Sequence, residues 1–255
     1  MAISRNDLIP SFFEAADGEK LAYYTIGEGR PIVLIHGLFS NSWTNWVRYG
    51  HAERIAAGGH RVIMADLRGH GASAAPHDPA AYPPDILARD ALALIDHLRI
   101  QDYDLGGYSL GARTTVRALV HGATPRRAFG AGMGLEGILR TQGRGSFFRR
   151  VLENRGTHER GSPEWMSEAF LKTTGGDPIA LLQILNTFVD TRREQIEAIA
   201  TEMAVICGID DHDNGSAEAL AALFPHGRYQ EIPGNHMSAV LKPELGAAIV
   251  AFINE

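Results

Sequence analysis

The sequence predicts an α/β protein in which helices cover both faces of a mostly parallel, eight-stranded sheet. Short apolar runs typical of buried strands, such as 32–35 and 204–208, alternate with longer helix-compatible segments along most of the 255 residues. Such alternation is typical of βαβ units, which build parallel sheets. The exception is 137–198, where no strand is evident and helix-compatible segments are separated by Gly-rich breaks.

The elements follow in order along the chain. A hairpin around the turn 16–19 comes first, with strands at 11–15 and 20–26. We expect the other strands at 32–35, 61–65, 103–106, 127–131, 204–208 and 228–232, and helices at 42–57, 84–98, 110–121, 164–173, 179–189, 216–223 and 243–253. The sheet and its covering helices therefore occupy 1–136 and 199–255, and 137–198 is a helical insertion after the sixth strand.

Composition limits the classes of partner and compartment. The net charge of −6 is mild and argues against nucleic acid, and no segment reaches membrane-spanning or signal-peptide length. Cys207 is the one cysteine and lies in an apolar strand, which indicates a buried, inert thiol and no intrachain disulfide. We expect a cytoplasmic protein with a small-molecule substrate, and the sequence leaves its oligomeric state open.

The most informative stretch is Gly107-Tyr108-Ser109-Leu110-Gly111, between a predicted strand and a predicted helix. A serine on so sharp a turn needs glycines two residues to either side, because a Cβ there would be crowded. The turn exposes the hydroxyl of Ser109. The amide of Leu110 then lies at a helix N-terminus, where it can bind developing negative charge.

Three other loops follow predicted strands and complete this pattern. The loop His36-Gly37-Leu38 can bring the amide of Leu38 to the serine, which would complete an oxyanion hole with Leu110. Downstream, Asp211 follows the strand 204–208 and His236 follows the strand 228–232. Serine, aspartate and histidine thus come in the chain order of the α/β-hydrolases.

The chain resembles the α/β-hydrolase-fold proteins of the esterase, lipase and C–C hydrolase kind over nearly its full length. Five segments carry the resemblance in order: His36-Gly37, the turn 66–71, the serine turn 107–111, Gly208 to Asp211, and Gly234 to His236. The resemblance implies the α/β-hydrolase fold, and it makes the insertion 137–198 a cap that roofs the pocket and sets substrate choice. A serine nucleophile sets the chain apart from haloalkane dehalogenases and epoxide hydrolases of this fold, which use an aspartate.

The expected chemistry is a catalytic triad. Ser109 would attack, His236 would take its proton, and Asp211 would orient and stabilise the imidazolium. Asp210, Asp213 and Glu136 compete with Asp211 for the role of acid. We expect no metal and no organic cofactor, because the acidic cluster 210–213 has no recognisable coordination spacing.

Several other residues are candidates for supporting the site or for lining a substrate pocket. We interpret His36, His70, Asp66 and Arg68 as structural, holding the loops after two strands. Six arginines between 140 and 160 would suit an acidic substrate, but 137–198 holds nine basic and eight acidic residues, so a solvated face is the preferred interpretation. Five apolar residues are candidates for an acyl pocket or for buried core, namely Phe39, Trp43, Trp165, Phe170 and Phe188.

A carboxylic ester is the default substrate, and hydrolysis of a C–C bond in a ring-cleavage product uses the same triad. Because fold does not fix function, three non-hydrolytic classes stay open: a ligand receptor, a lyase and a cofactor-free oxygenase.

Overall fold

The computed structural model describes residues 4–255, which form one eight-stranded sheet. The strands are β1 (Ser11–Glu14), β2 (Lys20–Ile26), β3 (Arg30–Ile35), β4 (His60–Ala65), β5 (Asp104–Tyr108), β6 (Arg127–Ala131), β7 (Glu202–Gly208) and β8 (Gly227–Ile232). Their spatial order is β1-β2-β4-β3-β5-β6-β7-β8, with β2 antiparallel to both of its neighbours and all other pairs parallel. The predicted α/β-hydrolase architecture, mostly parallel and eight-stranded, is confirmed.

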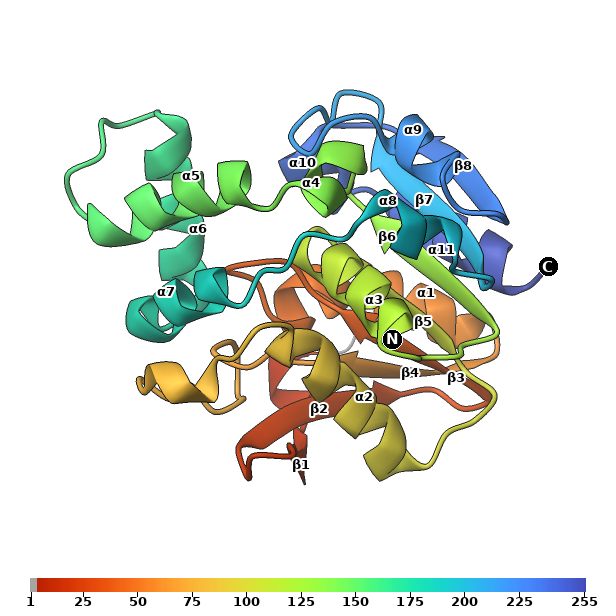
Figure 1. Ribbon diagram of the computed structural model, residues 1–255. Helices are drawn as coiled ribbons and strands as arrows, with labels where there is room; N and C mark the ends of the chain where they lie inside the picture. The colour runs from red at the N-terminus through yellow and green to blue at the C-terminus, as the bar shows by residue number, and fades with distance from the viewer. Residues whose placement is uncertain (1–3) are drawn as a thin grey trace.

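Helices cover both faces of the sheet (Figure 1). One face carries α1 (His51–Ala57) and α11 (Pro243–Ile253), and the other carries α2 (Ile86–Leu98), α3 (Leu110–Val120), α8 (Arg193–Glu197) and α9 (Ala217–Ala221). Side chains of β3 alternate between two hydrophobic cores: Ile32 and Leu34 join the core under α1 and α11, whereas Val33 and Ile35 join the core under α2 and α3. All four are buried, so β3 is a central strand covered on both sides.

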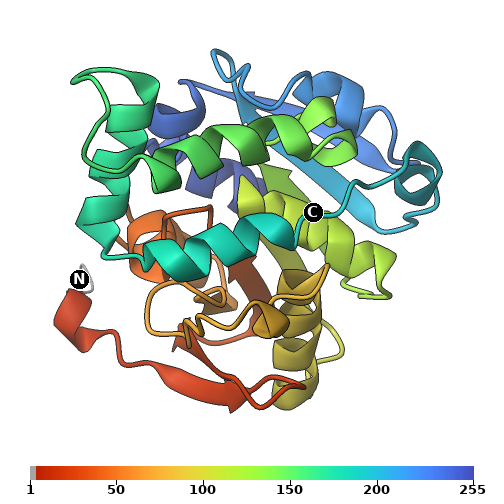
Figure 2. The ribbon, with the colours of Figure 1, turned by 60° about the vertical axis from the view of Figure 1, so that its left-hand side comes forward.

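A group of helices stands apart from these layers, between β6 and β7 in the chain (Figures 1 and 2). It follows α4 (Leu135–Leu139) and consists of α5 (Gln142–Glu153), α6 (Pro163–Thr174) and α7 (Pro178–Asn186). These three helices share a hydrophobic cluster of their own, with Val151, Leu152, Leu171, Leu181 and Leu185. Phe39 joins this cluster from the loop after β3 and so ties these helices to the rest of the molecule. No described residue of 137–198 lies in a strand, as expected.

Several helices differ from the predictions: α4, α5 and α8 were not expected, and two further segments differ in form. The segment 42–57 is not one helix, because a π-helical turn (Trp43–Val47) and α1 are separated at Gly50, whose φ of 76° ends helical geometry. A short helix, α10 (His236–Ala239), begins where only a loop was expected. The Asn235 side chain caps α10 by accepting hydrogen bonds from the amides of Met237 (3.2 Å) and Ser238 (2.9 Å), which fixes the backbone around His236.

Buried charges hold the loop after β4. The carboxylate of Asp66 accepts hydrogen bonds from the amides of Ser42 (2.7 Å) and Ala72 (2.8 Å). Arg68 is fully buried and is bonded through two nitrogens to Asp90, both at 2.9 Å, and also to Asp17. Because a buried guanidinium needs several partners to offset its desolvation, this network makes the loop rigid, in agreement with the structural role expected for Asp66 and Arg68.

Candidate active site

Ser109 lies on the turn between β5 and α3, with φ of 55° and ψ of −110°. A positive φ is strained for a non-glycine residue, and here it lifts the side chain out of the sheet. The turn is closed by Gly107 and Gly111. A Cβ on Gly111 would lie 2.0 Å from the carbonyl oxygen of Ile35, and one on Gly107 would lie 2.4 Å from the carbonyl carbon of Gly111. The glycines therefore allow β3, β5 and α3 to approach closely beneath the serine.

The structure brings the three predicted triad residues together. The Nε2 atom of His236 is 3.0 Å from the hydroxyl oxygen of Ser109, and its Nδ1 atom is 2.9 Å from Oδ2 of Asp211. The parallel register explains the meeting, because β5, β6, β7 and β8 all end at the same edge of the sheet. The hydroxyl of Tyr108 donates a 2.6 Å hydrogen bond to the carbonyl oxygen of His236, which joins the histidine loop to the strand that carries the serine.

The environment of Asp211 keeps its carboxylate ionised. Burial raises the pKa of this group, but the hydrogen bond and charge of His236 and the amide of Asp213, 3.2 Å from Oδ1, lower it, and the net pKa is below its ordinary value. An ionised carboxylate only accepts hydrogen bonds, so His236 donates from Nδ1. Nε2 is then free to accept the proton of Ser109, the state that a general base requires.

The competing acids lie elsewhere. Glu136 accepts a hydrogen bond from the amide of Ser216 at 3.1 Å, which places its carboxylate at the start of α9. Asp213 is half exposed and forms an ion pair with Arg144 of α5 at 3.1 Å. Asp210 is exposed. Of the four acids weighed from the sequence, Asp211 is the one hydrogen-bonded to His236.

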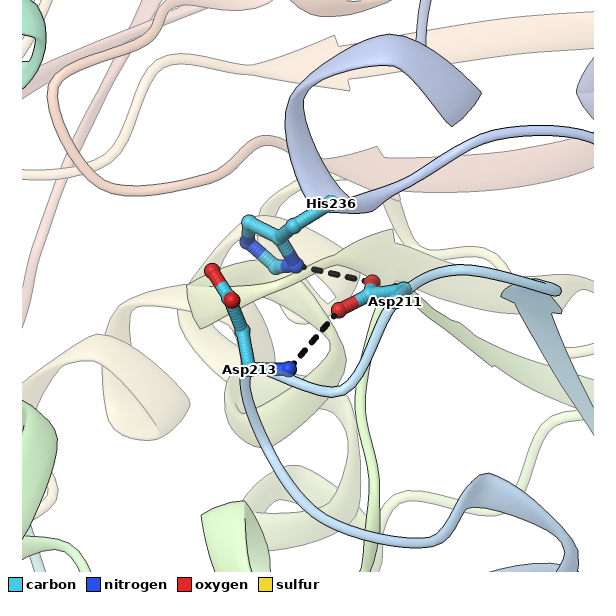
Figure 3. Close-up of side chains that lie close together, drawn as sticks. All are labelled: Asp211, Asp213 and His236. Carbon is cyan, nitrogen blue, oxygen red and sulfur yellow. Dashed lines mark hydrogen bonds and ion pairs between the residues drawn. The ribbon is translucent and has the colours of Figure 1, made fainter. Parts of the chain in front are cut away.

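Asp211, Asp213 and His236 each offer one atom within 4.8 Å of the others, close enough for a cation to be considered (Figure 3). Two of these atoms are already engaged with each other in the 2.9 Å hydrogen bond, and the carboxylate of Asp213 is paired with Arg144. A cation would have to displace both interactions. The donor set fits a triad better than a metal centre.

The two residues whose amides were expected in an oxyanion hole come from the turn itself and from the loop packed on it. Leu110 is the first residue of α3, so its amide has no partner within the helix. Gly37 packs on the turn so closely that a Cβ there would lie 3.5 Å from Cβ of Ser109, and Leu38 follows it. Within residues 4–255, neither amide donates a hydrogen bond to another group.

The profile of the alpha/beta hydrolase family matches residues 32–249, most of the chain. The chain belongs to this family. An epoxide hydrolase of Caballeronia sordidicola is 35% identical over 140 residues, which are 55% of this chain and 41% of that protein, so the chain spans about two fifths of that relative.

Solved structures share the fold over their whole length. A hydrolase from Pseudomonas aeruginosa has a TM-score of 0.75 at 24% identity, covering 96% of this chain and 98% of its own. An esterase from Exiguobacterium antarcticum has a TM-score of 0.75 at 21% identity, covering 97% of this chain and all of its own.

Of the described residues, none forms a helix long and apolar enough to cross a membrane.

The two histidines interpreted as structural are buried beside the site. Nδ1 of His36 lies 2.8 Å from the carbonyl oxygen of Gly37, and its Nε2 accepts from the amide of Leu67 at 3.0 Å. Burial lowers the pKa of His36 to about 4 and that of His70 to about 3, so both rings are neutral near pH 7. His36 thus links the loop that carries Leu38 to Leu67, and His70 packs against its ring with Nδ1 3.0 Å from the carbonyl oxygen of Arg68.

Two residues next to the site were not singled out from the sequence. Tyr108 reads as a strand residue, and the bond from its hydroxyl to His236 depends on a loop more than a hundred residues away. Arg113 reads as the polar side of an amphipathic helix, yet only 5% of the residue is exposed. Its position one helical turn after Ser109 was the sequence signal that could have placed it next to the site.

Proposed function

We propose that this member of the alpha/beta hydrolase family is a serine hydrolase that cleaves small carboxylic esters through an acyl-enzyme. The observation that carries the proposal is the continuous chain of hydrogen bonds from Ser109 through His236 to Asp211. A serine hydroxyl is too weak an acid to attack unaided. An imidazole in the correct tautomer at 3.0 Å supplies the base that it lacks.

In the first half-reaction, the hydroxyl oxygen of Ser109 attacks the ester carbonyl carbon while its proton passes to Nε2 of His236. The amides of Leu38 and Leu110 receive the negative charge that develops on the carbonyl oxygen. Asp211 stabilises the imidazolium through Nδ1. The C–O bond to the alcohol then breaks, and His236 returns the proton to the leaving oxygen, which leaves an ester on Ser109.

In the second half-reaction, a water molecule takes the place of the departed alcohol. His236 removes its proton as it attacks the acyl carbon, and the same two amides hold the second oxyanion. Collapse of this intermediate releases the carboxylic acid and returns the proton to Ser109. Each proton transfer runs through Nε2, so the fixed ring orientation serves both halves.

The nucleophile separates this proposal from the chemistry of the sequence relative named above. The sequence resemblance implies that epoxide hydrolases of this fold use an aspartate at the turn, whereas this chain has Ser109. The cap helices α5–α7 enter the proposal as the roof of the acyl pocket. Phe39 supports this role, because it is buried in the cap cluster and lies one residue after Leu38.

The decisive experiment is intact-mass measurement after exposure to a fluorophosphonate probe, which needs no knowledge of the substrate. We expect a single adduct on the wild type and none on Ser109→Ala or His236→Ala. A panel of ethyl esters of increasing acyl length then follows. A well-folded wild type that forms no adduct would overturn the proposal and move the receptor, lyase and oxygenase classes ahead.

A further inference from the structure

Arg113 is a buried cation beside the catalytic turn. It lies on α3, one helical turn after Ser109, so their Cα atoms are about 6 Å apart along the helix axis. Nη2 donates a 2.6 Å hydrogen bond to the carbonyl oxygen of Gly137 at the base of the cap. Nε and Nη1 are buried and have no hydrogen-bond partner among the described residues.

The environment of this guanidinium differs from that of the other buried arginines. Arg68 has two carboxylates as partners, and Arg117 forms a two-nitrogen pair with Asp85. Among the residues that the structure describes, no carboxylate forms an ion pair with Arg113, whose guanidinium carbon lies 4.7 Å from the ring centre of Phe188. Burial lowers its pKa to about 10, which still leaves it charged at pH 7.

Leaving donors of a buried charge unpaired is costly, so such groups are rarely found without a ligand or a task. A pocket of about 20 Å³ adjoins Arg113, enough for about one water molecule. Its wall includes Leu110, Thr114 and Phe188, and also Asp85 and Arg117, which are paired with each other. Leu110 directly follows Ser109 and begins α3, so this lining residue is next to the catalytic turn in the chain.

Phe188 connects this pocket to the cap. It packs against both the core beneath α3 and the cluster shared by α5–α7, as Leu38 does. Phe188 is partly exposed and lies in the segment after α7. A carboxylate needs more room than one water molecule, so the pocket must widen to admit it, and Phe188 is its partly exposed wall.

We propose that Arg113 binds a carboxylate at the far end of the acyl chain, so that the preferred substrates are half-esters of short dicarboxylic acids. This inference rests on the proposed ester hydrolysis. The rise of about 6 Å along α3 from Ser109 to Arg113 is about the length of an acyl chain of four to six carbons, so we expect short substrates. Two further charges act on Arg113: Asp190 favours its charged form, and Arg144, already paired with Asp213, opposes it. An added carboxylate would be attracted by Arg113 and Arg144 and repelled by Asp190, while Asp85 in the pocket wall is already neutralised by its pair with Arg117.

The first test compares two substrates of the same length. Monoethyl glutarate carries the terminal carboxylate, and its terminal amide is the neutral match; ethanol release is followed by NMR. We expect the ratio of kcat/KM for the acid to that for the amide to fall at least tenfold in Arg113→Met. Arg150→Met, which removes an exposed arginine of the cap, should leave the ratio unchanged. Arg113→Gln is the second variant, in case Arg113→Met does not fold.

The second test measures binding without turnover. In Ser109→Ala, we expect calorimetry to give a dissociation constant for glutarate at least tenfold lower than in Ser109→Ala/Arg113→Met. Equal glutarate affinity, or equal substrate ratios in wild type and Arg113→Met, would overturn the carboxylate site while leaving ester hydrolysis standing. A wild type without fluorophosphonate adduct would overturn the proposed function instead, and glutarate binding would still decide the role of Arg113.

Discussion

Asp211→Asn tests whether the Asp211 carboxylate sets the tautomer of His236. One carboxylate oxygen of Asp211 accepts from the amide of Asp213 at 3.2 Å, and the other accepts from His236 at 2.9 Å. An asparagine must keep its oxygen toward the Asp213 amide, which turns its NH₂ group toward Nδ1 of His236. The imidazole then becomes an acceptor at Nδ1 and carries its proton on Nε2, facing Ser109.

In that tautomer, His236 cannot take the serine proton. The equivalent loss of tautomer control in a serine protease costs about 10⁴ in kcat, and a factor of this size corresponds to about 5 kcal/mol of transition-state stabilisation. We expect the second-order rate of fluorophosphonate labelling of Asp211→Asn at pH 7.5 to fall by about 10³ to 10⁴. Thermal unfolding should show that the fold is kept.

Glu136→Gln is the matched control, because it makes the same chemical change in the competing acid. Its amide oxygen can still accept from Ser216, so labelling should stay within about threefold of wild type. The reasoning is refuted if Asp211→Asn labels within tenfold of the wild type, and the acid would be reassigned if Glu136→Gln loses activity instead.

Three further predictions concern the turn, pH and metal. Gly111→Ala places a Cβ 2.0 Å from the carbonyl oxygen of Ile35 and should lower the free energy of unfolding by about 3 kcal/mol or more in urea titrations, whereas Gly145→Ala, with open space around it, should not; equal stabilities would contradict the packing. His36 and His70 bind protons less readily folded than unfolded, so stability present above pH 6.5 should fall by up to about 4 kcal/mol between pH 6.5 and 5, and a flat profile would argue against their burial. Dialysis against EDTA should leave the labelling rate unchanged, and a loss restored by a divalent cation would revive a metal role for the acidic cluster.

The sheet was predictable because its strands carry a strong local signal. The run from Ile32 to Ile35 is apolar on both faces, as expected for a strand buried on both sides, and it lies within β3. The meeting of Ser109, Asp211 and His236 was also predictable. Each residue follows a strand, and the carboxyl ends of parallel strands lie at the same edge of the sheet. Their distances then follow from the parallel register.

The cap was less predictable. Helix α5 was missed because its first turn contains Gly143 and Gly145, and glycine has a low helix propensity when considered alone. Phe147 and Phe148 contact the cap cluster only once α7 and the loop at Phe39 are in place. The burial of Arg113 also depends on distant segments, since Gly137 and Phe188 both come from outside α3. Local propensity cannot report contacts of this kind.

The position of the helical insertion bears on how such a protein can diversify. The chain leaves the sheet after β6 and re-enters it at β7, and these two strands are direct neighbours in parallel register. Both ends of the insertion are therefore anchored by the same strand pair, whatever the length or sequence between them. Helices α5–α7 therefore lie outside the order of strands that brings Ser109, Asp211 and His236 together. A change in the length of the insertion would leave that strand order, and the meeting of the three residues, unaltered.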